Sequence, residues 1–340
     1  MILRGPGNNP QVERGMFSVS VVIPAFNAEG TIASAVRSAL GQEQVSEVIV
    51  VDDCSTDRTV EAARAGDDGS NKLILVRERV NGGPALARNR GFEVATGNYI
   101  ALLDADDRFL PGRLKNLFEA AGDDWDMAAD NVAFVNQNTD PRAVPVRATR
   151  GSARPLSLVE FIEANISQPG RRRAELGFLK PVIRRDFLQR HGLRYDTNLR
   201  LGEDFQFYVR GFLAGARFRV SSGCGYIAVE RSSSLSGLHR TQDLGALAAA
   251  DRDLLSGMDG NSPAAAAMLR HHQHIRGRFR YRTFLDLRRR IGVARALAAF
   301  IRKPADLAVI LVSYVLDKAM ARTAGRRTEN MTRVRFLMEF

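Results

Sequence analysis

The chain has 340 residues, of which 45% are hydrophobic and 26% are charged, a composition that fits an ordinary globular protein and excludes an intrinsically disordered one. Its formal net charge of +11 favours anionic partners, namely phosphates, nucleic acid or an acidic membrane surface. Two cysteines exclude a disulfide framework and fit a reducing compartment. No stretch resembles a signal peptide or a transmembrane helix, so we expect a cytoplasmic protein.

The first half of the chain alternates between strand and helix patterns. Residues 1–16 are rich in Gly, Asn and Pro and predict a flexible tail. Four short apolar runs are typical of strands buried on both faces, at 17–23, 48–51, 73–76 and 99–103. Between these runs, apolar residues recur at helical spacing and predict amphipathic helices. Pro24 is expected to end the first strand. Four strands that alternate with three helices predict right-handed βαβ units and a parallel sheet, independently of any motif.

Acidic side chains stand where two of these strands end. Asp52 and Asp53 follow the second strand, and Asp104, Asp106 and Asp107 follow the fourth. Because parallel strands end at one edge of the sheet, these acids are expected to converge on one ligand. Crowded carboxylates repel each other unless a cation neutralises them, and their oxygens suit Mg²⁺ or Mn²⁺ shared with substrate phosphates. The alternative is a helix start with an acidic first turn.

A basic residue, Arg88, lies near the start of the helix that Pro84 begins. Helix N-termini favour anions, so Arg88 or Arg90 is a candidate to contact a phosphate there. The alternative for a single arginine is a solvated helix face.

A second acidic pair, Glu203 and Asp204, stands directly before a helical apolar face. That face consists of Phe205, Tyr208, Val209, Phe212 and Leu213. At about 100° per residue, Asp204 falls at the border of the face and Glu203 nearly opposite. We therefore expect Asp204 to point into the protein and Glu203 to cap the helix or face solvent. The alternative is that both acids complement the helix dipole.

The sequence pattern predicts fewer helices and strands after the four strands of the parallel sheet. We expect a strand at 126–136, a helix at 156–166 and two further strands at 218–220 and 226–229. The three arginines at 171–173 either approach a phosphate or belong to a solvated loop.

Residues 241–340 are predicted to form a helical C-terminal region. Its two most apolar pieces, at 291–301 and 307–320, are too short to span a bilayer. Flanking arginines make them similar to an interfacial anchor on an anionic membrane leaflet. The equal alternative is a helical pair that packs on the preceding domain or on a second subunit. The histidines at 271, 272 and 274 are expected on a solvated basic face.

The chain resembles the family 2 glycosyltransferases of the GT-A fold in four segments, VVIPAFNAEGTI at 21–32, VIVVDDCSTDRT at 48–59, NGGPALARNRG at 81–91 and NYIALLDADD at 98–107. The resemblance covers residues 17–135 and continues more weakly to Asp204. It implies an α/β fold with a Rossmann-like, mostly parallel sheet flanked by helices. The glycosyltransferase domain would span residues 17–240 and would be followed by the helical C-terminal extension.

The resemblance also implies roles for individual residues. Asp104 would face the ribose or the donor sugar, Asp106 would hold Mn²⁺ or Mg²⁺, and Asp204 would be the catalytic base. Arg88 would lie near the nucleotide, and His239 is a candidate metal ligand, with a surface histidine as the alternative. The nucleotide-sugar site would further include Pro24, Ala25, Phe26, Asn27, Glu29, Asp52, Asp53 and Ala105.

Together these features predict an inverting, metal-dependent enzyme that transfers one sugar at a time from a UDP-sugar to a saccharide. Inversion, glucose as the sugar and a lipid-linked acceptor in exopolysaccharide biosynthesis follow from the resemblance, which extends to succinoglycan-type enzymes. Processive members carry Gln-x-x-Arg-Trp after the base, whereas the single tryptophan here, Trp125, precedes Asp204. A homodimer and peripheral attachment to the inner face of the cytoplasmic membrane fit the C-terminal region.

Two other classes of protein are weighed against this prediction. A Rossmann dehydrogenase would need G-x-G-x-x-G after the first strand, and this chain has PAFNAEG there. A non-catalytic basic α/β protein that binds nucleic acid or another polyanion would use the positive charge. Acids at the strand ends would repel such a polyanion, so we favour the enzyme and expect no nucleic-acid partner.

Overall fold

The computed structural model describes residues 2–3, 17–137, 139, 144, 152–167, 175–230, 240–324 and 334–339. Its strands are β1 (Ile2–Leu3), β2 (Val19–Ala25), β3 (Val45–Asp52), β4 (Leu73–Arg77), β5 (Tyr99–Leu102), β6 (Arg108–Phe109), β7 (Met127–Asn136), β8 (Arg154–Pro155), β9 (Val182–Arg184), β10 (Phe218–Glu230) and β11 (Arg335–Phe336). Its α-helices are α1 (Ile32–Leu40), α2 (Thr59–Arg64), α3 (Pro84–Val94), α4 (Arg113–Ala121), α5 (Leu158–Ala164), α6 (Arg185–Arg190), α7 (Glu203–Leu213), α8 (Thr241–Ser256), α9 (Pro263–Ile291), α10 (Val293–Ala298) and α11 (Pro304–Ala324).

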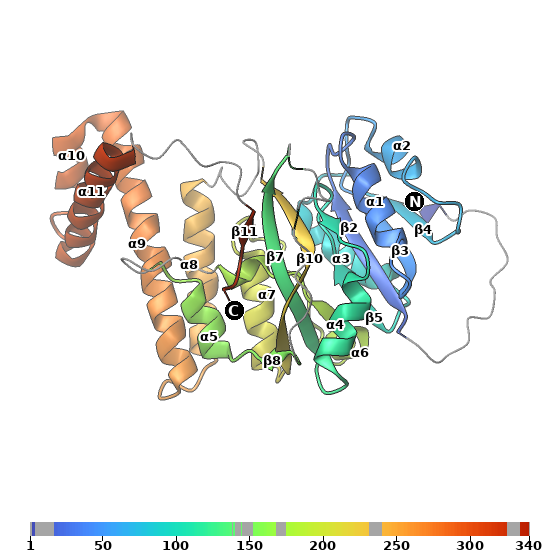
Figure 1. The fold of residues 1–340 in the computed structure, drawn as a ribbon. Coiled ribbons are helices and arrows are strands. Elements are labelled where there is room, and N and C mark those ends of the chain that lie inside the picture. The colour runs from blue at the N-terminus through green and yellow to red at the C-terminus, as the bar shows by residue number, and fades with distance from the viewer. Residues whose placement is uncertain are drawn as a thin grey trace.

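All strands belong to one twisted sheet in the order β1-β4-β3-β2-β5-β9-β7-β10-β6, with β8 beside β10 and β11 beside β7 (Figure 1). The four central strands β4, β3, β2 and β5 are parallel. Helices α1 and α2 pack together against β3, and α3 packs against β2 and β3. Almost every side chain of β2 and β3 is buried, as their continuous apolar runs predict. The predicted α/β fold with a parallel βαβ half is confirmed.

Pro24 does not end the first strand, contrary to the prediction. It is paired with Val51 of β3, and β2 continues to Ala25. On its other side β2 pairs with β5 only as far as Val22. A proline is tolerated here because no neighbouring strand requires its missing N–H.

The second half of the sheet is mixed. Strand β9, which the sequence pattern did not indicate, lies antiparallel between β5 and β7, and β7 is parallel to β10. The two strands expected at 218–220 and 226–229 are one continuous strand, β10. Its pairing with β7 shifts register between Val220 and Tyr226, where Ser and Gly residues allow the chain to bulge.

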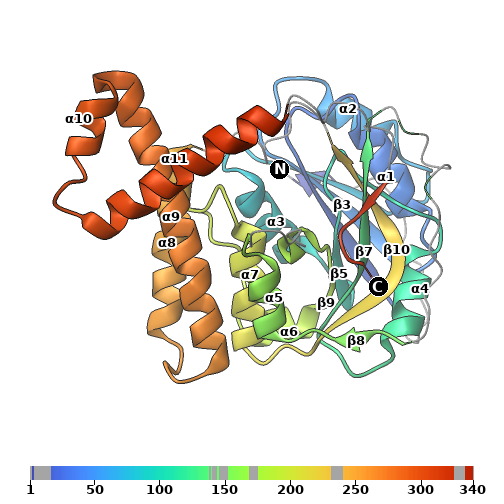
Figure 2. The same ribbon diagram turned by 60° about the vertical axis from the view of Figure 1, so that its left-hand side comes forward.

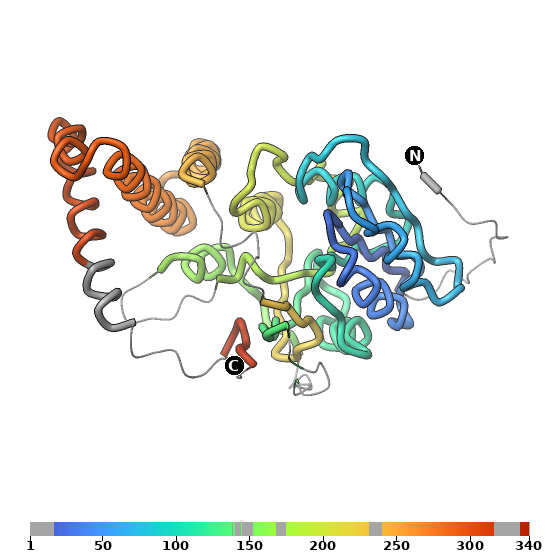
Figure 3. Tube along the Cα trace, turned by 90° about the horizontal axis from the view of Figure 1, so that it is seen from above, coloured from blue at the N-terminus to red at the C-terminus, as the bar shows by residue number. Residues whose placement is uncertain are grey.

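The C-terminal helices extend away from the sheet. Helices α8 and α9 form an antiparallel pair, and α9 also packs on α5. Helices α10 and α11 pack on α9 and lie at the end of the molecule remote from β2–β4 (Figure 1). Figure 2 shows α11 crossing α9. Figure 3 shows the same elongated arrangement from above, with the N-terminal strands and the last helices at opposite ends. Among the described residues no helix combines the length and the hydropathy needed to cross a bilayer.

Both ends of the described chain return to the sheet. Ile2 and Leu3 pair with β4, whereas the rest of the predicted tail, 4–16, lies outside the described residues. Residues 334–339 are not part of a helical region, because β11 pairs with β7 and the Asn131 side chain bonds both N–H and C=O of Met338. The prediction of a purely helical segment at 241–340 is therefore wrong for its last residues. Their apolar side chains complete the core on that side of the sheet.

Candidate active site

The acidic strand ends meet at one edge of the sheet. Strands β3 and β5 flank β2 and run in the same direction, with Ala25 beside Asp52 and Val22 beside Leu102. The carboxyl ends of all three strands therefore face the same region, which is where open α/β sheets bind ligands.

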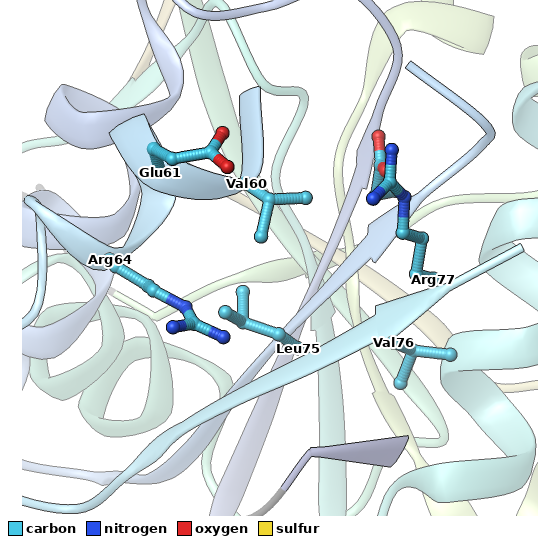
Figure 4. A pocket seen from close by; sticks show the side chains of 7 residues that line it. Val60, Glu61, Arg64, Leu75, Val76 and Arg77 are labelled. Atoms are coloured by element: carbon cyan, nitrogen blue, oxygen red, sulfur yellow. The ribbon is translucent and has the colours of Figure 1, made fainter. Parts of the chain in front are cut away.

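Asp52 is almost fully buried beside a pocket of about 230 Å³. One carboxylate oxygen accepts a hydrogen bond from Ser55 N at 3.2 Å. The other, Oδ2, lies 3.2 Å from Nε of Arg77 but accepts no hydrogen bond from the described residues. In Figure 4 the pocket wall is formed by Val60, Glu61 and Arg64 of α2 and by Leu75, Val76 and Arg77 of β4. A ligand N–H can supply the hydrogen bond that Oδ2 of Asp52 lacks.

Asp53 holds the turn before α3 through both of its carboxylate oxygens. Its two oxygens accept the N–H groups of Gly82 and Gly83 at 2.8 and 2.7 Å. Gly83 stands at the N-cap of α3 with φ of 85°, a conformation that favours glycine. The carboxylate fixes the start of the helix that carries Arg88. The role of Asp53 in nucleotide binding stays a prediction.

The loop after β2 contains the predicted site residues Pro24, Ala25, Phe26, Asn27 and Glu29. Ala25 is buried, whereas Phe26 is 47% exposed beside the strand end. Asn27 and Glu29 bind the loop that follows β3, because Asn27 Oδ1 accepts Thr56 N and Glu29 Oε2 accepts Arg58 N. Within this loop, Phe26 is therefore the side chain most available to a ligand, and Asn27 and Glu29 fix the loop that presents it.

Asp104 lies between two cationic side chains. Arg88 of α3 is 3.0 Å from its Oδ1, and Lys180 is 3.0 Å from its Oδ2. Burial raises the pKa of Asp104, but Lys180 and Arg88 outweigh burial and hold that pKa well below the usual range. The cations that neutralise the acidic cluster are thus partly supplied by the protein itself.

Asp107 turns away from this network toward β10. Its two oxygens accept hydrogen bonds from the Tyr226 hydroxyl at 2.7 Å and from Val229 N at 2.9 Å. Burial raises the pKa of Asp107, and the negative charges of Asp104 and Asp106 raise it further. Asp107 therefore ties the acidic loop to the sheet. Ala105 and Asp106, between the two acids, are partly exposed.

Asp204 faces Asp104 across Lys180. Lys180 Nζ lies 2.9 Å from Oδ2 of Asp204, and the Tyr195 hydroxyl donates to Oδ1 at 2.9 Å. Arg88 is 3.5 Å from the same Oδ1. Burial lowers the pKa of Lys180, but Asp104 and Asp204 reverse this effect and raise it above its usual value. Asp204 thus points into the protein at the N-terminus of α7, as predicted from helical periodicity.

Glu203 also faces the network, so the prediction of a capping or solvated side chain is wrong. Its Oε1 lies 3.3 Å from Arg88 NH1. The N-terminus of α7, rather than one side of the helix, points at the site, and both first-turn residues therefore reach Arg88. Gly202 caps the helix with φ of 74°, where a Cβ would also lie 2.9 Å from Leu247. The chain can make this turn only with a residue that tolerates both constraints.

Buried contacts fix Lys180 and Tyr195, which no sequence pattern singled out. The carbonyl oxygen of Lys180 accepts a hydrogen bond from Arg113, which also forms a bidentate pair with Asp130. The backbone of Tyr195 is bonded on both sides to the side chain of Asn89 in α3. A single lysine before β9 and a tyrosine in a loop resemble surface residues in the sequence. Only their neighbours in space mark them as members of the site.

Helix α7 is held from behind by α8 and α9. Gln206 donates to Asp251 at 2.7 Å, and His271 Nδ1 lies 2.9 Å from the other oxygen of Asp251. The His271 ring also stacks on Phe205 with centroids 4.0 Å apart. His271 is buried, so its predicted place on a solvated basic face is wrong. This contact couples the helix of Asp204 to the C-terminal region.

Replacing Asp251 with alanine is expected to lower the free energy of unfolding by about 3 kcal/mol, because it leaves two buried polar side chains without their acceptor. Chemical denaturation followed by circular dichroism measures the change. Asp253→Ala, on the exposed face of the same helix, is the matched control and should cost less than about 0.5 kcal/mol. Equal effects of the two substitutions would contradict a structural role for the Gln206–Asp251–His271 contact.

The described residues contain no group of three acidic, histidine or cysteine side chains arranged to hold a metal ion. The carboxylate oxygens at this edge of the sheet nevertheless suit a hard divalent cation, since Mg²⁺ and Mn²⁺ are commonly held by one or two carboxylates together with substrate phosphates. Asp106 supplies such a carboxylate, partly exposed at the carboxyl edge of the sheet. His239 and the arginines at 171–173 lie outside the described residues, so their predicted roles stay predictions.

The known proteins that this chain is similar to identify its family. The model of the family named glycosyl transferase family 2 matches residues 20–189. The chain is 47% identical over 302 residues to the succinoglycan biosynthesis protein ExoU of Rhizobium meliloti, covering 88% of this chain and 87% of ExoU. It is 36% identical over 288 residues to ExoO of the same organism, covering 82% and 79% of the two chains.

Solved structures show the same fold. Residues 1–349 of S. aureus TarS, in complex with UDP-GlcNAc, superpose with a TM-score of 0.59 at 19% identity, covering 87% of this chain and 89% of that one. The mannosyltransferase PcManGT of Pyrobaculum calidifontis, in complex with GDP-Man and Mn²⁺, gives 0.52 at 20% identity, covering 88% and 79%. The predicted GT-A architecture and enzyme class are confirmed: this chain belongs to the family 2 glycosyltransferases.

Proposed function

We propose that the enzyme transfers one sugar, with inversion, from a UDP-sugar to a saccharide acceptor in the assembly of a bacterial exopolysaccharide. The observation that carries this proposal is that Asp104, which follows β5, and Asp204 of α7 lie on opposite sides of Lys180. A donor held by Asp104 would lie within reach of a base at Asp204. The names of ExoU and ExoO support exopolysaccharide, and specifically succinoglycan-type, assembly. Glucose and a lipid-linked acceptor are the finer parts of the proposal.

The uridine would bind near Asp52. The buried Oδ2 of Asp52 would accept a hydrogen bond from the N–H of the uracil base, and the exposed Phe26 ring would stack on that base. Asp104 would hold the ribose or the donor sugar, with Arg88 beside the nucleotide. Asp106 would hold Mn²⁺ or Mg²⁺, which when bound neutralises the negative charge of the departing diphosphate.

Asp204 would act as general base. A hydroxyl of the acceptor attacks the anomeric carbon, its proton passes to an oxygen of Asp204, and the bond from that carbon to the diphosphate breaks. Burial and then Asp204 raise the pKa of Tyr195, so its hydroxyl stays protonated and donates to the carboxylate. Lys180 and Tyr195 thus orient the Asp204 carboxylate.

Truncating Phe26 tests the nucleoside part of the proposal. Phe26→Ala is expected to raise the dissociation constant for UDP by about tenfold, because stacking of a base on an aromatic ring is lost. Calorimetric titration with UDP in Mn²⁺ measures the change. Val80→Ala, a substitution at a still more exposed apolar residue, is the control and should bind UDP normally. If Phe26→Ala bound UDP with unchanged affinity, the uracil base would not stack on the Phe26 ring.

The donor is identified by screening nucleotide sugars with and without Mn²⁺. The proposal expects a uridine diphosphate sugar to bind more tightly than its guanosine counterpart and to release UDP when a saccharide acceptor is present. A preference for a guanosine diphosphate sugar would contradict it.

A further inference from the structure

The outer surface of α10 and α11 is apolar although no described segment covers it. The exposed side chains come from the end of α9, from α10 and its following turn, and from α11: Ile291, Val293, Ile301, Val309, Leu311, Val312 and Val315. The opposite face of α11 is used for packing, where Ile310 contacts the core around Phe284 and Phe300. Helix α11 is thus apolar on two faces, and only one of them is needed to hold it in the protein.

Positive charge borders this apolar surface. Residues 288–305 contain six basic side chains and no acidic one. They are Arg288, Arg289, Arg290, Arg295, Arg302 and Lys303. The first acid beyond them, Asp306, is buried and paired with Arg280. Arg302 and Lys303 are exposed in the turn between α10 and α11, directly beside Ile301.

We propose that this surface docks the protein on an anionic lipid bilayer. We call it the membrane-facing patch, and it consists of the exposed apolar side chains and the bordering basic side chains named above. An apolar face bordered by arginine and lysine is the arrangement by which interfacial helices insert shallowly among acidic headgroups. Insertion of the exposed valines removes apolar surface from water, and the basic side chains reach the lipid phosphates.

A second copy of this chain fits the patch less well. A symmetric pair through α11 would bring two sets of six cations together around a desolvated interface, with no described acid on the patch to compensate. An anionic bilayer supplies the opposite charge. Helices α10 and α11 lie at one end of the molecule (Figure 1), and the apolar side chains of the patch are exposed with respect to the described residues. The inference depends on this surface alone, not on the donor or acceptor of the proposed function.

Vesicle sedimentation tests the inference with the full chain. The protein is expected to sediment with phosphatidylcholine vesicles that contain about one third phosphatidylglycerol, and to stay in solution with phosphatidylcholine alone. Val312→Gln with Val315→Gln, which leaves the charge unchanged, is expected to lower the partition coefficient about tenfold. Arg302→Gln with Lys303→Gln is expected to lower it by a similar factor, and raised salt should weaken the wild type.

A matched variant removes the same charge elsewhere. Lys115→Gln with Arg252→Gln changes two exposed basic residues, on α4 and near the end of α8, and should sediment like the wild type. Circular dichroism checks that each variant is folded. Equal binding by the valine variant, equal loss in the Lys115/Arg252 variant, or no sedimentation of the wild type overturns the inference. So does a wild-type dimer in solution that the valine variant converts to monomer, because the patch would then be a subunit interface.

Discussion

Replacing Asp204 with asparagine is expected to lower turnover by about 10²- to 10⁴-fold, because the acceptor hydroxyl loses its general base. Asparagine has nearly the same shape and still accepts the hydrogen bond from Tyr195, so the fold and the donor affinity should change little. Release of UDP with the donor and acceptor that support turnover measures the loss. Calorimetry with UDP measures donor binding separately.

The neighbouring Glu203 provides a close control for this substitution. It belongs to the same helical turn and contacts the same arginine, but Lys180 and Tyr195 contact Asp204 instead. Glu203→Gln should therefore lower turnover less than about tenfold. If Glu203→Gln lost most of the activity and Asp204→Asn little, Glu203 would be the base and the mechanism proposed for Asp204 would be wrong.

Replacing Asp106 with asparagine is expected to remove the metal dependence of donor binding. The variant should bind UDP in Mn²⁺ no more tightly than the wild type binds it in a chelator, and its turnover should fall about 100-fold or more. The reason is that a neutral amide is a poor replacement for a carboxylate as a ligand of a hard cation. Titrations of UDP with and without Mn²⁺ give this result without any acceptor.

Asp107 is the control for the metal experiment. It is adjacent in the chain, but its oxygens bind Tyr226 and Val229, and burial raises its pKa. Asp107→Asn should therefore keep the Mn²⁺-dependent affinity for UDP, whatever its effect on stability. Loss of that dependence in Asp107→Asn but not in Asp106→Asn would exchange the roles proposed for the two residues.

The pKa of Asp104 has a consequence for stability. A carboxylate whose pKa is lowered in the folded state stabilises the fold above its unfolded pKa, which for aspartate is about 4. This contribution is lost only as the pH falls through the lower folded value. The Lys180–Asp104–Arg88 contacts should therefore persist through the neutral range, so a change of activity near neutral pH must come from another group.

The sequence alone determined the parallel half of the fold and the place of its acids. Strands β2 to β5 are predictable because they are buried on both faces, and continuous runs of valine, isoleucine and leucine are then required. Asp52 and Asp104 are predictable because their strands are parallel and end at one edge. Asp204 could be oriented from helical periodicity, since one apolar face fixes the rotation of α7.

Only the tertiary structure decided which side chains neutralise and orient those acids. Lys180 and Tyr195 reach Asp204 from the segment before β9 and from a loop that is hydrogen-bonded to α3, and such pairings depend on how distant elements pack. Asp53 and Asp204 are both aspartates at the start of a turn or helix, yet one binds backbone N–H groups and the other faces the site. His271 looks like part of a basic surface but is buried against Phe205. Local periodicity specifies which face of an element is buried, whereas the partner of a buried charge is set by long-range contacts that the pattern of one element does not contain.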